Sequence, residues 1–162
     1  MIIDLSRKIF PSFEAFFDTL KTWKTSNHKL VFTNGCFDLL HRGHLDSLVQ
    51  AARLGDKLIV GLNSDTSVKR LKGVSRPLID EESRAHMLAA LEMVDAVILF
   101  DEDTPYPLIK AIRPDILAKG NDYAISEIAG ADLVQSYGGT VALLPLTKGF
   151  SSSSLIEKIK NS

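Results

Sequence analysis

The chain has 162 residues, of which 45% are hydrophobic, and a formal net charge of −1 at pH 7. This length suits one globular domain, and the scattered basic residues argue against binding to nucleic acid or to an acidic membrane surface. The single cysteine excludes an internal disulfide, and no apolar run approaches the roughly 20 residues of a membrane span. Because the amino terminus also lacks a signal-peptide pattern, we expect a soluble cytoplasmic protein without nucleic acid or membrane partners.

Strand and helix signals alternate along the chain. Residues 12–23 carry apolar side chains at helical spacing after a possible cap at Ser12, so residues 1–28 are predicted to form a helical segment packed on a domain of residues 29–162. A turn is expected at Asn34-Gly35, where the first strand should break. The predicted strands are residues 30–32, 57–62, 96–100, 116–118 and 140–144, and the helices between and after them begin near residues 44, 66, 80, 107, 124 and 151. Further caps are predicted at Asp80 and at Asp103-Thr104-Pro105.

This alternation defines the expected fold class. Consecutive strand, helix and strand units call for parallel strands joined by right-handed crossovers, with helices on both faces of the sheet. We therefore predict an α/β protein, with a Rossmann-like three-layer αβα fold around a roughly five-stranded parallel sheet.

The junction after the first predicted strand carries two histidines. In an open α/β sheet this junction lies at the carboxyl end of the strand, where the new helix presents unpaired N–H groups and a positive dipole end to anions. His41 and His44 are three residues apart and so lie on one helix face, and Gly43 between them is expected to leave room for a ligand. The pattern predicts a phosphate-binding site.

The same junction carries a family resemblance. The segment reads Asn34-Gly35-Cys36-Phe37-Asp38-Leu39-Leu40-His41-Arg42-Gly43-His44 and resembles the signature of the HxGH cytidylyltransferase-like nucleotidyltransferases. Within that superfamily, the amino-acid sequence of this segment most resembles that of the enzymes that adenylylate D-glycero-β-D-manno-heptose 1-phosphate. Further matching motifs follow in the family's order, so that the resemblance covers roughly residues 29–159: Asn63-Ser64-Asp65, Arg70-Leu71-Lys72-Gly73, Arg76-Pro77, Lys119-Gly120-Asn121-Asp122-Tyr123 and Gly149-Phe150-Ser151-Ser152-Ser153.

The resemblance implies transfer of AMP from ATP to the heptose phosphate, which yields an ADP-heptose and pyrophosphate by in-line attack. The attacking phosphate monoester is already an anion at neutral pH, because its second pKa is about 6, so the site requires positioned donors and cations rather than a strong base. His41, His44 and Lys72 are the expected catalytic residues. Mg²⁺ is the expected cofactor and should bind mainly through the ATP phosphates, without a dedicated set of protein ligands.

The resemblance also implies binding residues. Those expected to contact the nucleotide or its phosphates are Asn34, Gly35, Phe37, Asp38, Gly43, Lys119, Gly120, Asp122, Tyr123, Ser151, Ser152 and Ser153. Those expected to contact the acceptor substrate are Asn63, Asp65, Arg76 and Arg84. The chain departs from the family patterns in having Asn121 in place of a glycine and serines in place of two threonines. Leu146 stands where glycerol-phosphate cytidylyltransferases usually carry an arginine, which favours the heptose group.

Several alternatives stay open at this level. Asp38 could bind ribose, water-bound Mg²⁺ or backbone N–H groups, and Cys36 is interpreted as a small structural residue because the reaction needs no thiol. A zinc site at the two histidines would need a third protein ligand. The rival functions are another member of the superfamily, such as a glycerol-3-phosphate cytidylyltransferase, and a non-catalytic nucleotide-binding module. By analogy we expect a homodimer, and a separate heptose kinase as pathway neighbour.

Overall fold

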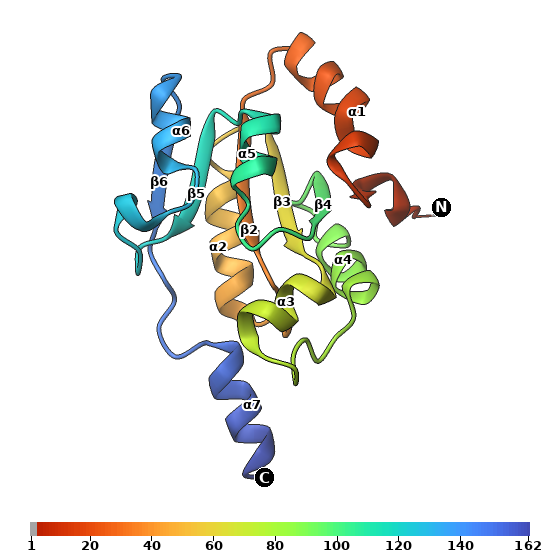
Figure 1. Cartoon of the computed structure of the whole chain (residues 1–162), viewed down its shortest axis with the longest axis vertical. Coiled ribbons are helices and arrows are strands. Elements are labelled where there is room, and N and C mark those ends of the chain that lie inside the picture. Colours follow the sequence, from red (N-terminus) through yellow and green to blue (C-terminus); the bar gives the residue numbers. More distant parts are fainter. Residues whose placement is uncertain (1–2) are drawn as a thin grey trace.

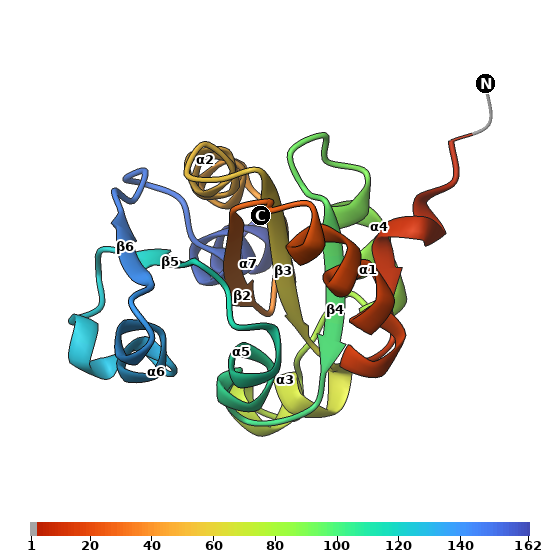
Figure 2. The ribbon, with the colours of Figure 1, turned by 90° about the horizontal axis from the view of Figure 1, so that it is seen from above.

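The computed structural model describes residues 3–162, which form a six-stranded sheet between two layers of helices (Figures 1 and 2). The strands pair in parallel in the order β1-β4-β3-β2-β5-β6. This arrangement confirms the predicted α/β fold class. The strands are β1 (Ile9–Phe10), β2 (Leu30–Gly35), β3 (Lys57–Asn63), β4 (Ala96–Phe100), β5 (Ile116–Gly120) and β6 (Thr140–Leu144).

The sheet has one strand more than the roughly five expected. The additional strand, β1, pairs with β4 through Ile9 opposite Val97 and Phe10 opposite Ile98. Two residues are too short to show an alternating pattern, so the sequence gives no signal for this strand. The amino-terminal segment that was predicted to be helical therefore also contributes a short edge to the sheet.

Seven α-helices and two short 3₁₀ helices connect the strands within residues 3–162. Side-chain caps form at two predicted positions, where Ser12 accepts a hydrogen bond from the amide of Ala15 and Asp80 accepts one from Ser83. The third predicted cap is not formed by a side chain, because the N-cap of α5 is Pro105. The helices are α1 (Phe13–Thr25), α2 (Arg42–Ala52), α3 (Asp65–Lys72), α4 (Glu81–Ala89), α5 (Tyr106–Ile112), α6 (Ala131–Ser136) and α7 (Ser152–Lys160), with η1 (Leu5–Lys8) and η2 (Ile125–Glu127).

Two local predictions need correction. β2 does not break at Asn34-Gly35, because its pairing with β3 continues to the partners Asn34 with Gly61 and Gly35 with Leu62. The single helix expected between Tyr123 and Tyr137 is instead divided into η2 and α6. At the start of α6, Gly130 adopts a left-handed φ of 85°, and a Cβ there would lie 2.7 Å from the side chain of Ile109.

Alternate residues of the central strands contribute side chains to two hydrophobic cores, one on each face of the sheet. Phe32 and Ile59 pack with α1, α5 and α6, whereas Val31, Leu58 and Val60 pack with α2 and α4. This alternation confirms the predicted three-layer arrangement. α7 has no buried residue and projects from the body of the protein (Figure 1). In residues 3–162, no helix combines the length and apolar character needed to cross a bilayer.

Candidate active site

A cavity of about 910 Å³ opens at the carboxyl ends of β2, β3 and β5. This is the edge of a parallel sheet at which ligands bind in open α/β folds. The cavity brings together side chains that are up to 119 residues apart in the sequence, from Asn34 to Ser153. Its wall contains most of the predicted site residues: Asn34, Gly35, Phe37, Asp38, His41, Gly43, His44, Asn63, Lys72, Arg76, Lys119, Asp122, Tyr123, Ser151, Ser152 and Ser153.

The two histidines cap α2 reciprocally and stack on each other. The amide of His44 donates to Nδ1 of His41, and the amide of His41 donates to Nδ1 of His44, both at 3.4 Å. The ring centroids are 3.8 Å apart with an interplanar angle of 22°. Because Nδ1 of each ring accepts a hydrogen bond, the proton of each neutral imidazole is assigned to Nε2, which is then the donor of the ring.

Both imidazoles are neutral at pH 7 in the ligand-free protein. Burial and, to a smaller extent, the neighbouring His41 lower the pKa of His44 to about 4, against the opposing effect of the Leu39 carbonyl. Burial also lowers the pKa of His41. A neutral pair can offer two N–H donors to phosphate oxygens, and a bound polyanion would favour protonation of either ring.

Gly43 and Gly35 leave space for side chains of the protein. A Cβ at Gly43 would lie 2.9 Å from Cε1 of His41 and 3.0 Å from Cβ of Phe150, and because Gly43 also lines the cavity, its room for a ligand stays a prediction. At Gly35, a Cβ would lie 3.0 Å from the ring of Phe37. Phe37 adopts a left-handed φ of 46°, and its ring centroid lies 5.2 Å from that of His44. Both glycines therefore allow aromatic rings to pack around the histidine pair.

A half-buried lysine joins the ends of β5 and β2. Nζ of Lys119 donates to the side-chain oxygen of Asn34 at 3.1 Å and to its backbone carbonyl at 3.4 Å. The same ammonium group lies 5.7 Å from the ring centroid of Tyr123. Burial lowers the pKa of Lys119, and the carboxylate of Asp122 opposes this effect. An anionic ligand in the cavity would add to the favourable effect of Asp122 on the charged lysine.

The start of α7 forms the opposite wall. Ser151 is the N-cap and accepts a hydrogen bond from the amide of Ser154 at 3.0 Å, whereas the hydroxyl of Ser152 donates to the carbonyl of Leu39 at 3.3 Å. The second contact attaches α7 to the turn that precedes His41. The positive ends of α2 and α7 therefore border the same cavity, which favours binding of a polyanion.

Most of the sequence matches a known protein family. A family model described as cytidylyltransferase-like matches residues 32–158, which is more than half of the chain. The chain belongs to the cytidylyltransferase-like family. The predicted membership of the HxGH nucleotidyltransferases is therefore confirmed.

Curated relatives of this cytidylyltransferase-like chain are longer proteins. It is similar to the bifunctional protein HldE of Syntrophotalea carbinolica, with 56% identity over 146 residues that cover 90% of this chain and 30% of that protein. It is also similar to the bifunctional protein HldE of Koribacter versatilis, with 55% identity over 84% of this chain and 28% of that protein. The chain thus spans less than a third of the length of these relatives.

Solved structures show the same fold. A lipopolysaccharide core biosynthesis protein from Thermoplasma volcanium superposes with a TM-score of 0.60 at 29% identity, covering 76% of this chain and 99% of that one. Pantoate-beta-alanine ligase from Francisella tularensis, in complex with beta-gamma ATP and beta-alanine, gives a TM-score of 0.65 at 16% identity, with 94% and 76% coverage. The second likeness supports the fold alone.

Three predicted binding residues do not line the cavity of this cytidylyltransferase-like domain. Arg84 is only 1% exposed, and its guanidinium forms an ion pair with Asp65, so neither is placed to bind the acceptor as expected. Gly120 lies behind the wall, because a Cβ there would lie 2.8 Å from both Asp122 and Leu146. These residues support the site from outside.

Asp38 lines the cavity, but its carboxylate is occupied by the protein. It is 2% exposed and accepts hydrogen bonds from the amides of Leu78 and Ile79 and from Nε of Arg76. Burial by itself would raise the pKa of Asp38, but these donors outweigh burial and hold it below its usual range. Of the three roles considered for Asp38, the structure supports binding to backbone N–H groups.

Some wall residues were missed by the sequence analysis. They are adjacent in sequence to predicted residues or follow a neighbouring strand, and Leu71, Gly149 and Phe150 also lie within the family motifs, so adjacency and the motifs are the signals that could have identified them. Cys36, which was interpreted as structural, also lines the wall, and burial raises the pKa of its thiol. The missed residues are Ser47, Leu71, Asp103, Leu146, Thr147, Lys148, Gly149 and Phe150.

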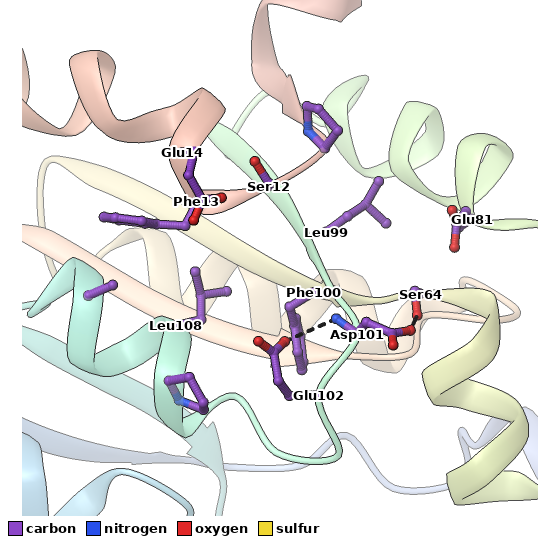
Figure 3. A pocket seen from close by; sticks show the side chains of 13 residues that line it. Ser12, Phe13, Glu14, Ser64, Glu81, Leu99, Phe100, Asp101, Glu102 and Leu108 are labelled. Atoms are coloured by element: carbon purple, nitrogen blue, oxygen red, sulfur yellow. Dashed lines mark hydrogen bonds between the residues drawn. The ribbon is translucent and has the colours of Figure 1, made fainter.

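A second cavity, of about 470 Å³, lies beside the carboxyl end of β4 (Figure 3). Four carboxylates line it together with apolar side chains, and its wall contains no basic residue. A phosphate group would be repelled there. The acidic residues are Glu14, Glu81, Asp101 and Glu102. Among residues 3–162, no three His, Cys, Asp or Glu side chains are grouped as the ligands of a metal ion would be.

Proposed function

We propose that this chain transfers AMP from ATP to D-glycero-β-D-manno-heptose 1-phosphate, giving an ADP-heptose and pyrophosphate. The stacked pair of His41 and His44 carries the proposal, because it borders one cavity together with Lys72, Lys119 and the start of α7. The choice of substrates is supported by the sequence resemblance described above and by the likeness to a lipopolysaccharide core biosynthesis protein. The nucleotidyltransferase family is shown, and the sugar and the nucleotide are the proposed part.

The strand order supports a particular orientation of the substrates. β2 lies between β3 and β5, so the histidines that follow β2 lie between two halves of the cavity. On the β5 side, three exposed apolar side chains offer surface for a nucleotide base: Tyr123 (46% exposed), Leu146 (47%) and Phe150 (42%). On the β3 side, Lys72 and Arg76 offer charged groups, whereas Asn63 is 3% exposed and its amide donates to Ser67. We place the base on the β5 side and the sugar phosphate on the β3 side.

In this arrangement the chemical step requires no base. A phosphate oxygen of the heptose phosphate, which is mostly a dianion at neutral pH, attacks the α-phosphorus of ATP. A new P–O bond forms while the bond to the bridging oxygen of pyrophosphate breaks, in line with the attack. The Nε2–H groups of His41 and His44 and the ammonium of Lys72 donate to the oxygens on which negative charge develops.

Mg²⁺ fits this wall as a cation bound mainly through phosphate oxygens. It keeps several water ligands and needs only one or two carboxylates, and it would neutralise charge on the triphosphate. The donors that occupy Asp38 limit it as a ligand, whereas Asp122 is an exposed carboxylate beside Lys119. Asp122 is therefore the side chain that we propose could contact the ion.

Pyrophosphate release across a panel of substrates tests the proposal. The panel pairs ATP or CTP with the heptose 1-phosphate, glycerol 3-phosphate or pantetheine phosphate. We expect the fastest release with ATP and the heptose phosphate. Faster release with CTP and glycerol 3-phosphate would instead identify a glycerol-3-phosphate cytidylyltransferase. Nucleotide binding without release from any pair would indicate a non-catalytic module.

The expected partners are also proposals. The acceptor carries a phosphate on its anomeric oxygen, so a sugar kinase must supply it, and we propose that a heptose kinase acts before this enzyme. A homodimer is proposed by analogy with related enzymes. Sedimentation equilibrium measures the mass in solution, and a monomer at micromolar concentration would contradict the dimer.

A further inference from the structure

Arg84 is the largest side chain that is fully buried among the described residues. It lies near the start of α4, and its guanidinium is charged at any physiological pH. A buried charge is costly unless it is paired and hydrogen-bonded, and an apolar side chain of similar volume often gives equal or higher stability. The presence of arginine at this position therefore calls for a reason other than stability.

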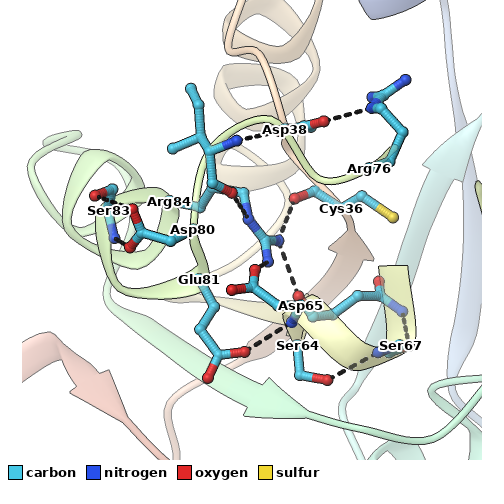
Figure 4. A network of polar contacts seen from close by, with 12 residues as sticks. Cys36, Asp38, Ser64, Asp65, Ser67, Arg76, Asp80, Glu81, Ser83 and Arg84 are labelled. Atoms are coloured by element: carbon cyan, nitrogen blue, oxygen red, sulfur yellow. Dashed lines mark hydrogen bonds and ion pairs between the residues drawn. The ribbon is translucent and has the colours of Figure 1, made fainter. Parts of the chain in front are cut away.

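The contacts of Arg84 connect three segments that border the active-site cavity (Figure 4). These are the turn after β2, the stretch from the end of β3 into α3, and the loop between α3 and α4. Nη1 donates to the carbonyl of Cys36, in the turn after β2, at 2.7 Å and to the carbonyl of Asn63, at the end of β3, at 2.8 Å. Nε donates at 2.9 Å to the carbonyl of Ile79, at the end of the loop between α3 and α4. Nη2 donates at 2.7 Å to Asp65, in the first turn of α3.

Asp38 holds the same loop through its backbone amides. Its carboxylate accepts from the amides of Leu78 at 2.8 Å and Ile79 at 2.9 Å. Ile79 thus donates its N–H to an anion and accepts at its C=O from a cation. Asp38 lies three residues before His41 in the turn that carries the histidine pair.

The first residues of the loop are exposed, and Arg76 is held by its ion pair with Asp38. Gly73 adopts a left-handed φ of 102°, with no atom within 4 Å of the position of a Cβ, and Val74 is 95% exposed. Lys72 lies at one end of this exposed stretch and Arg76 near the other, and both line the cavity. The contacts of Asp38 and Arg84 therefore fix the base of the loop to the histidine turn and to β3.

We propose that Arg84 and Asp38 are positioning residues, which set the place of the loop of residues 73–80, and with it Lys72 and Arg76, relative to His41 and His44. This inference rests on the proposed nucleotidyl transfer. Neither residue is proposed to contact the reacting atoms. Arginine serves this purpose because its planar fork reaches four acceptors at fixed directions, which the single ammonium group of a lysine does not.

Replacement of Arg84 tests the proposal through the split between kcat and binding. For Arg84→Met we expect kcat to fall by about a hundredfold, the size of loss that a misplaced catalytic group causes, while the Kd for ATP stays within about threefold. Arg84→Lys should lose about tenfold in kcat. The matched control is Arg53→Met, an exposed arginine at the end of α2, which should retain the wild-type kcat.

Hydrogen exchange provides a readout that does not depend on activity. In Arg84→Met and in Asp38→Asn, amides of residues 73–80 should exchange faster than in the wild type, while those of β4 stay protected. If Arg84→Met does not fold, Arg84→Lys and Asp38→Asn carry the test. Exchange is also measurable if the wild-type protein releases no pyrophosphate from any substrate pair, so failure of the proposed function is distinguishable from failure of the positioning role.

Two results would overturn the inference. One is a folded Arg84→Met protein with kcat within twofold of wild type, which would make the residue purely structural. The other is unchanged exchange in residues 73–80, which would show that the loop is held by other contacts. An unchanged kcat with a large rise in the Kd for ATP overturns the inference as well, because it assigns Arg84 to ligand binding.

Discussion

Two cavities open at the same edge of the sheet, and they differ in the charge of their walls. The larger one contains the histidine pair, Lys72 and Lys119, whereas the smaller one is lined by four carboxylates. Asn63 and Ser64 are neighbours in the chain, yet each lines a different cavity. The fold therefore forms cavities at the carboxyl ends of several strands, and the charges of the lining side chains determine which cavity can bind a polyanion.

The helix starts near the two cavities differ in a similar way. The start of α2 near the larger cavity is capped by imidazoles, whose Nε2–H groups remain donors. Beside the smaller cavity, α1 is capped by the hydroxyl of Ser12, and Glu14 follows in its first turn. The acidic side chain opposes the positive end of α1 and disfavours anions there. A helix start alone is therefore insufficient to identify a phosphate site in this protein.

The largest expected effect comes from removal of the histidine pair. The double variant His41→Ala/His44→Ala should lose at least about a hundredfold in turnover, the scale of losing an oxyanion donor, with the fold retained by circular dichroism. The matched double variant in the acidic cavity, Glu14→Gln/Glu102→Gln, should keep turnover within about twofold. Equal losses in the two variants would remove the functional distinction between the cavities.

The second effect concerns the cation at the end of α3. Lys72→Met should lower kcat/KM by about tenfold to a hundredfold, because a charge-assisted hydrogen bond to phosphate contributes about 1.5–3 kcal/mol. Lys69→Met, an exposed lysine one turn earlier on the same helix, is the control and should have little effect. Steady-state kinetics of pyrophosphate release measures kcat/KM for both variants. Similar losses of kcat/KM in the two variants would indicate that the positive charge of α3 as a whole attracts the substrates, without a specific contact from Lys72.

A third prediction uses the pH dependence of stability. The pKa of His44 is about 4 in the folded protein and about 6.5 when unfolded, so between these values the unfolded state binds more protons. The free energy of unfolding should therefore fall as the pH drops from about 6.5 to 4, and His44→Gln should reduce this slope. The lowered pKa of Asp38 gives a separate loss, which begins as the pH falls below about 4.

Thermal and urea unfolding at several pH values measure these slopes. An NMR titration of the imidazole signals assigns the His44 proton directly. Protonation of His44 near pH 6.5 in the free protein would contradict the lowered pKa of this imidazole.

The smallest expected effect is at the start of α7. Ser151→Ala removes the N-cap and should cost about 1 kcal/mol of helix stability. Because α7 has no buried residue, this loss should appear as fraying of the helix and a rise of about threefold in KM for ATP, with kcat nearly unchanged. Ser136→Ala, at the end of α6, is the matched control. A lowered kcat in Ser151→Ala would indicate a direct role for its hydroxyl in the transition state.

Much of the fold could be predicted because its signals are local. β4 spans the predicted residues 96–100, and Ser12 and Asp80 cap helices as expected, since side-chain capping depends on residues three or four positions apart. Most candidate site residues also line the cavity, because carboxyl ends of parallel strands meet at one edge. β1 was missed because its two residues acquire strand structure only by pairing with β4.

The roles of individual charged residues were harder to predict. Arg84 and Arg76 have the same side chain and lie eight residues apart in the sequence, and both were expected to bind the acceptor. Arg84 is buried among backbone carbonyls, and only Arg76 lines the cavity. Similarly, the sequence left three possible partners for Asp38: ribose, water-bound Mg²⁺ or backbone N–H groups. Only its contacts with the amides of Leu78 and Ile79, about forty residues away in the chain, decide in favour of backbone N–H groups.

The sequence alone determined the alternation of strands and helices, the helix caps and the histidine pair, because each depends on interactions between residues close in the chain. It also determined the family, through motifs that lie in a characteristic order. The tertiary structure decided which cavity carries positive charge, which arginine is buried and what fills the space beside Gly43. These outcomes depend on contacts between distant segments, whose directions and distances are fixed only when the sheet and its loops pack together.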